Sequence, residues 1–213
     1  MDLTLIQKIA IYALPVIFAI TVHEAAHGYV ARYFGDMTAH QQGRISLNPL
    51  RHIDPVGTIL IPMLTLALGG ILFGWAKPVP VSFGRLRNPK QDMLWVAAAG
   101  PASNLVMAIL WAMVIKLSAG LPEAMALPLS LMGQAGISIN VVLMVLNLLP
   151  LPPLDGGRIA VSLLPHHLAY RFAAVERYGF AILLMLMFTG ILGRILWPVI
   201  NLVTGLLSLL FNL

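Results

Sequence analysis

The sequence has no cysteine and little charge, and both absences narrow what the chain can be. Without cysteine there are no disulfides and no thiolate metal sites, so any metal must bind through His, Asp or Glu. Charged residues make up 10% of the chain, against about 25% in a typical soluble domain, while 59% of the residues are apolar. This deficit of charge indicates that lipid surrounds most of the protein.

Long apolar runs divide the 213 residues. A helix needs about 20 apolar residues to cross a bilayer, and most of the runs reach that length, although the fifth is short. The runs cover about 3–22, 55–73, 93–115, 127–151, 179–193 and 195–212. We therefore expect an all-α polytopic membrane protein with about five or six transmembrane helices, including a re-entrant hairpin, and a short extended segment at the membrane edge.

The linkers between the runs are rich in Gly and Pro and leave no room for a separate soluble domain. We expect one membrane domain over residues 1–213, with its core in 1–165 and C-terminal helices in 178–213. The formal charge of +5 comes from basic residues in the linkers, which is typical of membrane proteins. We therefore do not expect nucleic acid as a partner.

A histidine pair marks the end of the first apolar run. His23, Glu24 and His27 form an H-E-x-x-H pattern. On a helix, residues four apart share one face, so both imidazoles can reach one Zn²⁺ while Glu24 lies close enough to act on water beside it. Ionisable groups are costly at membrane depth and are usually functional there. The alternative is a polar helix end that faces lipid headgroups or caps a loop.

A catalytic zinc site usually has three protein ligands, and Asp155 is the best candidate for the third. It follows a long apolar run and three prolines, and two glycines follow it. A broken helix at membrane depth is tolerated where it lines a polar cavity. The alternative is that Asp155 caps the next helix. We expect Asp36, Asp54 and Asp92, which lie in basic linkers, to be solvated. The remaining histidines are expected at the surface: His40, His52, His166 and His167.

Both candidate ligand segments end an apolar run, so the two helices that carry them should run in the same direction. An odd number of crossings must then lie between them, yet two runs intervene. Run 55–73 is interrupted by Pro62 and by two glycines, and we expect it to be the re-entrant hairpin. Basic residues place linkers 28–52 and 74–92 in the cytoplasm, which predicts an outside N-terminus and a site nearer the cytoplasmic face. Arg194 is the one residue that this scheme misplaces.

Three segments resemble, in their order along the chain, the signatures of the site-2 proteases, which are intramembrane zinc metalloproteases of the M50 type. They are HEAAH, the segment from Gly100 to Asn104, and the stretch NLLPLPPLDGGR that begins at Asn147. The segment from Phe73 to Val81 also looks like part of the small bacterial members. The resemblance covers about residues 20–165 and extends to no PDZ or CBS domain.

The resemblance implies that His23, His27 and Asp155 hold zinc and that Glu24 is the catalytic base. It also implies that Asn147 positions the substrate or stabilises the transition state, and that Asn104 lies beside the active site among the substrate-binding residues. The substrates would be single-span membrane proteins or peptides. The location would be the bacterial inner membrane, with the lipid bilayer around the helices. A zinc-binding membrane transporter or a non-proteolytic scaffold is the alternative.

A helical substrate must unwind before its peptide bonds can be attacked. The stretch from Lys77 to Ser82 contains Pro78 and Pro80, so we expect it to be extended. It could bind the unwound substrate edge to edge, and the prolines, which lack an N–H group, would limit pairing to one edge. The substrate-binding candidates here are Lys77, Pro78, Val79, Pro80 and Val81. A plain proline-rich linker is an equal alternative.

Overall fold

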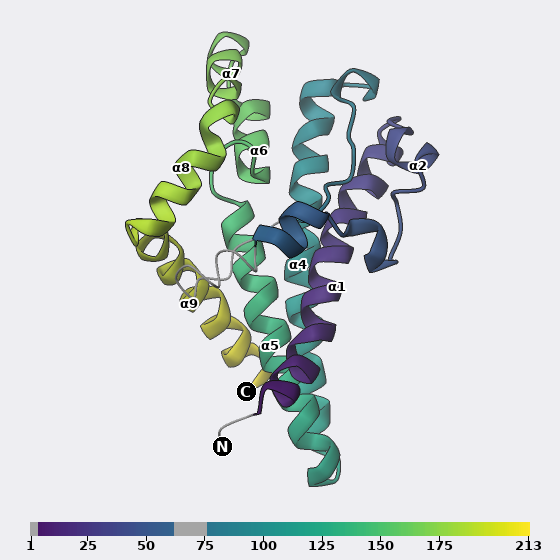
Figure 1. Ribbon diagram of the computed structural model, residues 1–213, viewed down its shortest axis with the longest axis vertical. Helices are drawn as coiled ribbons and strands as arrows, with labels where there is room; N and C mark the ends of the chain where they lie inside the picture. The colour runs from purple at the N-terminus through teal and green to yellow at the C-terminus, as the bar shows by residue number, and fades with distance from the viewer. Residues whose placement is uncertain (1–3, 62–75) are drawn as a thin grey trace.

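This computed structural model describes residues 4–61 and 76–213, and every regular element within those ranges is helical (Figure 1). The all-α expectation is confirmed. The α-helices are α1 (Leu5–Tyr33), α2 (Thr38–Gln41), α4 (Pro89–Ser118), α5 (Glu123–Asn147), α6 (Asp155–Leu163), α7 (His166–Ala173), α8 (Glu176–Phe188) and α9 (Ile191–Phe211). Shorter helical turns are η1 (Pro49–His52), η2 (Pro55–Leu60) and η3 (Phe83–Arg85).

Four of the described helices are long and apolar enough to cross a membrane, namely α1, α4, α5 and α9. The protein is therefore a multi-pass integral membrane protein. Helix α8 has 13 residues and is too short for a span; it turns into α9 at Gly190, whose φ is +72°. Of the expected hairpin 55–73, residues 62–73 lie outside the described part, and residues 55–60 form the turn η2.

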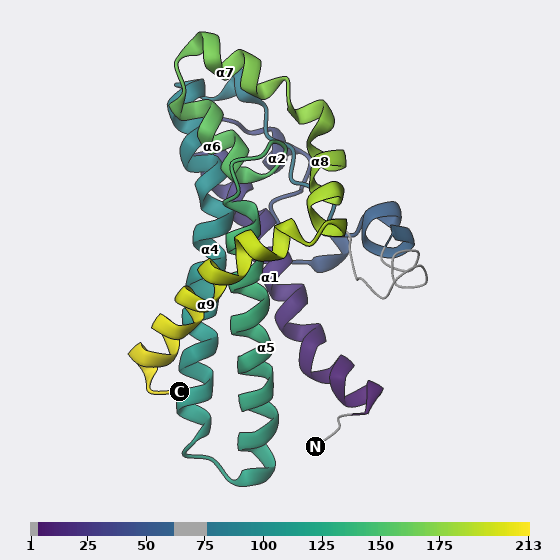
Figure 2. The same cartoon turned by 90° about the vertical axis from the view of Figure 1, so that its left-hand side faces the viewer.

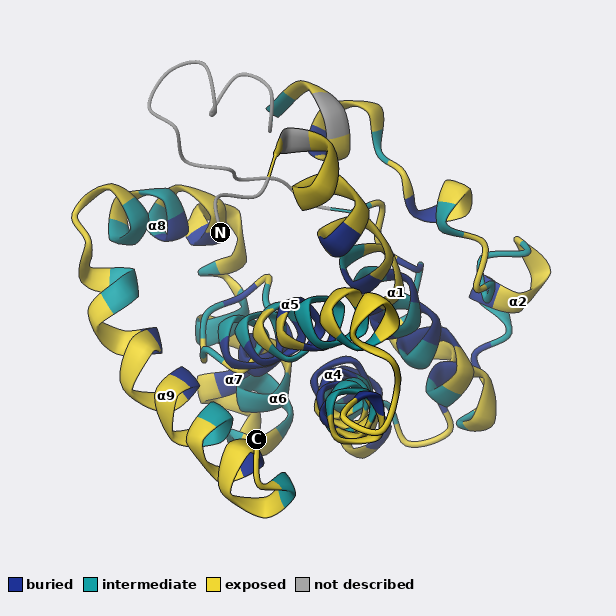
Figure 3. Cartoon of the chain, turned by 90° about the horizontal axis from the view of Figure 1, so that it is seen from below, coloured by how far each residue is buried: buried dark blue, intermediate teal, exposed yellow. Residues whose placement is uncertain are grey.

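Helices α1, α4 and α5 form the bundle that carries the site. In Figures 1 and 2, α4 runs opposite to α1, and α5 returns in the direction of α1 after a short turn. The two ligand-bearing stretches therefore lie toward the same end of the bundle, as the sequence predicts. Seen from below, the buried faces of these helices point toward one another and the exposed faces point outward (Figure 3).

Small residues allow α4 and α5 to pack closely. A Cβ atom at Gly136 would lie within 3.0 Å of the Trp111 ring, and one at Gly133 would meet Ile115. Close backbone approach at small residues is how membrane helices gain packing contacts without a hydrophobic driving force. Helix α9 packs against α5, where Leu196 and Ile200 form an apolar cluster with Val141 and Met144.

The segments that the sequence assigns to linkers hold buried polar groups that it does not reveal, although Asp92 lies in the first turn of α4. The expectation that Asp36 and Asp92 are solvated is wrong, because both are buried and accept hydrogen bonds from backbone N–H groups. The expectation that His52 lies at the surface is also wrong: it is buried, with its Nε2 atom 2.8 Å from the carbonyl oxygen of Ser46. Asp54 is half-buried. The other three histidines outside the motif are exposed as expected: His40, His166 and His167.

Candidate metal centre

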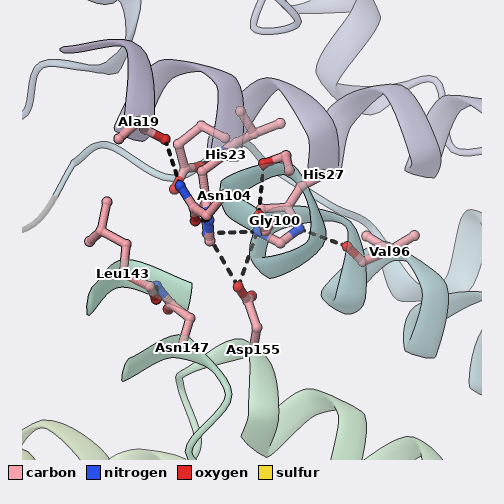
Figure 4. A network of polar contacts seen from close by, with 12 residues as sticks. Ala19, His23, His27, Val96, Gly100, Asn104, Leu143, Asn147 and Asp155 are labelled. Atoms are coloured by element: carbon pink, nitrogen blue, oxygen red, sulfur yellow. Dashed lines mark hydrogen bonds and ion pairs between the residues drawn. The ribbon is translucent and has the colours of Figure 1, made fainter. Parts of the chain in front are cut away.

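Helices α1 and α6 bring His23, His27 and Asp155 together (Figure 4). The Asp155 Oδ2 atom lies 3.2 Å from His23 Nε2 and 3.3 Å from His27 Nε2. The two Nε2 atoms are 3.1 Å apart. All three side chains are buried. Within ranges 4–61 and 76–213, this is the one group of His and carboxylate side chains arranged to hold a metal ion.

The spacing of the histidines follows from an unbroken helix around the motif, since positions four apart lie on one face. Asp155 reaches them because the chain breaks after α5 and restarts at α6. Gly156 and Gly157 make this restart possible. A Cβ atom at either position would lie within 3.0 Å of backbone atoms of the preceding loop.

Gly100 lets the backbone of α4 press directly against the two imidazoles. A Cβ atom there would lie within 3.0 Å of His27 Nε2 and of His23 Cε1 and Nε2. Any side chain at position 100 would therefore have to displace the rings. The α4 backbone forms one wall of the cluster.

Hydrogen bonds on the far side of each ring fix how the imidazoles are protonated. His27 Nδ1 lies 2.7 Å from the carbonyl oxygen of Val96, which can only accept, so Nδ1 carries the proton. His23 Nδ1 lies 2.6 Å from Asn104 Oδ1, which likewise accepts. In their neutral form both rings therefore present the Nε2 lone pair toward Asp155. Such contacts are how proteins orient metal-binding histidines.

The cluster fits a metal ion by its own chemistry. Asp155 Oδ2 is buried without a hydrogen-bond donor, and two nitrogen lone pairs face it. Three electron-rich atoms this close are unfavourable unless a cation lies between them. A single proton can bridge only one pair of the three. Nitrogen and carboxylate ligands of this kind suit zinc.

Glu24 lies beside the cluster on α1 and contacts the non-helical stretch of residues 76–82. Its Oε2 atom accepts a hydrogen bond from the Val79 N–H group at 2.7 Å. Glu24 is half-buried, while Val79 is buried and packs near Gly28. The expected base and the expected substrate-binding stretch are thus in direct contact.

Residues 76–82 form no helix, and their extended conformation stays a prediction. Backbone contacts fix the N-terminal half of this stretch. Lys77 donates its N–H to the carbonyl oxygen of His52 at 2.8 Å. Arg44 Nη2 donates to the carbonyl oxygens of Lys77 and Pro78 at 2.9 and 3.2 Å. One guanidinium therefore clamps two successive peptide groups.

Asp36 holds the other end of the stretch. Its Oδ2 accepts from the Ser82 N–H at 2.6 Å, and its Oδ1 accepts from the N–H and hydroxyl of Thr38. Burial by itself raises the pKa of this carboxyl, but the hydrogen bonds from Thr38 and Ser82 and the charge of Arg85 outweigh it and lower the pKa below its ordinary value. Asp36 is thus an anion that ties two linkers together.

The two predicted asparagines lie in different surroundings. Asn147 is half-buried at the last residue of α5, and its Nδ2 donates to the carbonyl oxygen of Leu143 at 3.0 Å. Asn104 is fully buried behind His23. Its position indicates that it orients the histidine; direct contact with a substrate stays a prediction.

Sequence reasoning missed Arg44, Asp36 and Asn140. Asn140 alone carried a signal, because it is a polar residue in the middle of the apolar run 127–151. Arg44 looks like any other basic residue of its linker, and only the folded chain shows that it reaches residues 33 and 34 positions further on.

These features define a multi-pass membrane protein with a buried His-His-carboxylate cluster between its helices. The family model described as "Peptidase family M50" matches residues 122–189. "Putative zinc metalloprotease YwhC" of Bacillus subtilis is 42% identical over 189 residues, which are 87% of this chain and 83% of that protein. "Putative zinc metalloprotease Rip2" of Mycolicibacterium smegmatis is 34% identical over 184 residues, which are 84% and 66% of the two chains.

The chain belongs to peptidase family M50 and is a metalloprotease of that family. The Rip2 protein of Mycobacterium tuberculosis H37Rv is 33% identical over 143 residues, which are 65% of this chain and 51% of that protein. No solved structure matches the chain significantly.

Proposed function

We propose that this protein is an intramembrane zinc protease of the site-2 type, which cuts transmembrane protein substrates with water. His23, His27 and Asp155 would hold the zinc. The observation that carries the proposal is the convergence of three buried ligand atoms, of which Asp155 Oδ2 has no hydrogen-bond partner. The names of two relatives specify zinc, and four helices that are long and apolar enough to cross a membrane support an intramembrane site. The bacterial inner membrane is the proposed location.

When bound, zinc lowers the pKa of water to about 7 and polarises the scissile carbonyl. The residues of the chain supply the proton transfers. Glu24 follows the first ligand on α1, where it takes the proton of the attacking water and delivers it to the leaving amine. Asn147 ends α5 just before the break that leads to Asp155. Its amide donates to the oxyanion that forms at the cleaved bond.

The extended stretch is the proposed binding edge for the unwound substrate. In an extended chain, alternate residues direct their N–H groups to the same edge, so Lys77, Val79 and Val81 share one. On that edge the Val79 N–H already donates to Glu24. A substrate that pairs with Val79 must therefore take this N–H from Glu24, and the same step frees the carboxylate to act as a base.

Two substitutions test the function. Glu24→Gln should keep zinc but lower the cleavage rate of a reconstituted membrane substrate by about 10²–10⁴-fold, because the base is lost. Asp155→Ala should lose both zinc and cleavage, since a ligand is removed. Zinc content by atomic emission and initial rates in proteoliposomes are the measurements.

Glu123→Gln is the matched control, because Glu123 is exposed at the start of α5 and should leave both readouts unchanged. Full cleavage by Glu24→Gln would refute the mechanism. A wild-type protein that binds zinc at this cluster without cutting any membrane substrate would favour a transporter or scaffold. Wild-type protein without zinc would refute the metal site itself.

A further inference from the structure

A chain of buried amides leads from the middle of α5 to the first histidine. Asn140 Nδ2 donates to the carbonyl oxygen of Gly136 at 2.8 Å. Asn104 Nδ2 donates to Asn140 Oδ1 at 2.9 Å, and Asn104 Oδ1 lies 2.6 Å from His23 Nδ1. Asn140 and Asn104 are both fully buried. Figure 4 shows the end of this chain, where Asn104 meets His23.

Backbone carbonyls set the direction of every hydrogen bond in the chain. The Gly136 carbonyl only accepts, so the amide nitrogen of Asn140 must face it and the oxygen must face Asn104. Asn104 must then turn its nitrogen toward Asn140 and the Ala19 carbonyl, which lies 3.2 Å away. Its oxygen is left for His23.

A carboxamide oxygen accepts and never donates, so His23 must carry its proton on Nδ1. In the neutral ring the Nε2 lone pair then faces His27 and Asp155, as a metal requires. Asn140 touches none of the ligand atoms, but it supplies one of the two acceptors that hold the Asn104 amide in this sense. The other acceptor, the Ala19 carbonyl, is the longer of the two contacts.

We propose that Asn140 is a positioning residue for the metal centre: through Asn104 it holds His23 with its proton on Nδ1 and its Nε2 free for the ion. This inference rests on the proposed zinc site. The alternative is a purely structural role, since polar residues in membrane helices can also hold helices together by hydrogen bonds. In that case Asn140 would affect stability and leave metal binding alone.

Isosteric substitutions of Asn140 separate the two roles. Asn140→Leu removes the acceptor and should weaken zinc binding about 10-fold, the lower end of what outer contacts to metal ligands contribute. Asn140→Asp keeps an acceptor for Asn104 whether or not the carboxyl is protonated, so zinc affinity should stay within about threefold of wild type. Chelator competition on the purified full-length protein in detergent gives the dissociation constants.

The route through Asn104 is tested by a double-mutant cycle. Asn104→Leu should weaken zinc binding by about 10–100-fold, and adding Asn140→Leu should weaken it no further. The visible spectrum of the Co²⁺-loaded protein should change in both single variants, because it reports the geometry of the ligands. Val141→Ala is the matched control. Val141 is the next residue, 1% exposed within the apolar cluster, and its truncation should lower stability without changing zinc affinity.

Wild-type affinity in Asn140→Leu, or additive losses in the cycle, would overturn the inference while the zinc site stands. If Asn140→Leu does not fold, Asn140→Ala, which also removes the acceptor, decides: zinc affinity lowered about 10-fold with a changed Co²⁺ spectrum would support the inference, and wild-type affinity would contradict it. A wild-type protein that binds no zinc would instead refute the proposed function on which the inference rests.

Discussion

The two sides of the candidate site are held in different ways. On the histidine side, both rings are buried between helices, and the Nδ1 atom of each is hydrogen-bonded to a buried group of α4. On the glutamate side, the half-buried Glu24 accepts a hydrogen bond from the stretch of residues 76–82. Arg44 and Asp36 of the linkers hold this stretch in place by further hydrogen bonds. Helix packing makes the first side rigid, whereas a few separable contacts hold the second. We therefore expect the histidine side to be preformed and the glutamate side, which is the proposed substrate-binding edge, to move more easily.

Gly100→Ala should disrupt the histidine side and give the largest effect on zinc binding. The added Cβ would lie within 3.0 Å of both imidazoles, and the α4 backbone that carries it is itself packed on α1 and α5. The rings must turn away, so we expect zinc affinity to fall by about 100-fold or more, comparable with the loss of outer contacts to a metal ligand. Chelator competition measures it.

Gly205→Ala is the control for this change, because a Cβ atom there meets nothing within 4 Å on α9. It should leave zinc affinity alone and stabilise the helix slightly. Wild-type zinc affinity in Gly100→Ala would show that the imidazoles can move aside without losing the ion. The histidine side would then be no more rigid than the glutamate side.

Arg44→Gln should weaken the contacts on the glutamate side while the metal centre stays intact. It removes a charged donor from the carbonyl oxygens of Lys77 and Pro78, and such bonds contribute about 1.5–3 kcal/mol each. We expect substrate cleavage to slow by about 10-fold with unchanged zinc content. Initial rates in proteoliposomes and zinc analysis are the measurements.

Arg32→Gln provides the comparison. Arg32 is exposed at the end of α1, and its guanidinium contacts the exposed His40. It should cleave at the wild-type rate. Equal rates for the two variants would mean that the clamp on the extended stretch does not matter for the reaction.

Local sequence patterns anticipated the site better than they anticipated its supports. The HEAAH spacing places two rings on one helix face whatever the tertiary fold, and the broken helix before Asp155 is visible in its prolines and glycines. The burial of Asp36 and Asp92 was not visible, because a carboxylate in a basic linker looks solvated until the chain folds donors onto it. The assignment of Asn104 to substrate binding followed the family resemblance, and only the structure shows it against His23.

Asp36→Asn should give the smallest effect, and we expect this effect to be confined to the glutamate side. An amide can still accept from Thr38, but its nitrogen would face the Ser82 N–H, so the second bond is lost. We expect about 1–3 kcal/mol less stability at neutral pH, a cleavage rate lowered a few-fold, and unchanged zinc affinity.

The pH dependence of this loss identifies its origin. The pKa of Asp36 is lowered in the folded protein, so its stabilisation is present above its unfolded pKa of about 3.9 and is lost as the pH falls through the folded value. The stability gap between wild type and Asp36→Asn should therefore be largest near neutral pH and close in acid, as followed by unfolding in detergent. Asp54→Asn should leave cleavage unchanged, because Asp54 bonds only to its own turn among the hydrogen bonds of the described linkers. A gap that persists undiminished in acid would show that the ionised carboxylate does not hold the extended stretch, and the glutamate side would then owe its position to packing, like the histidine side.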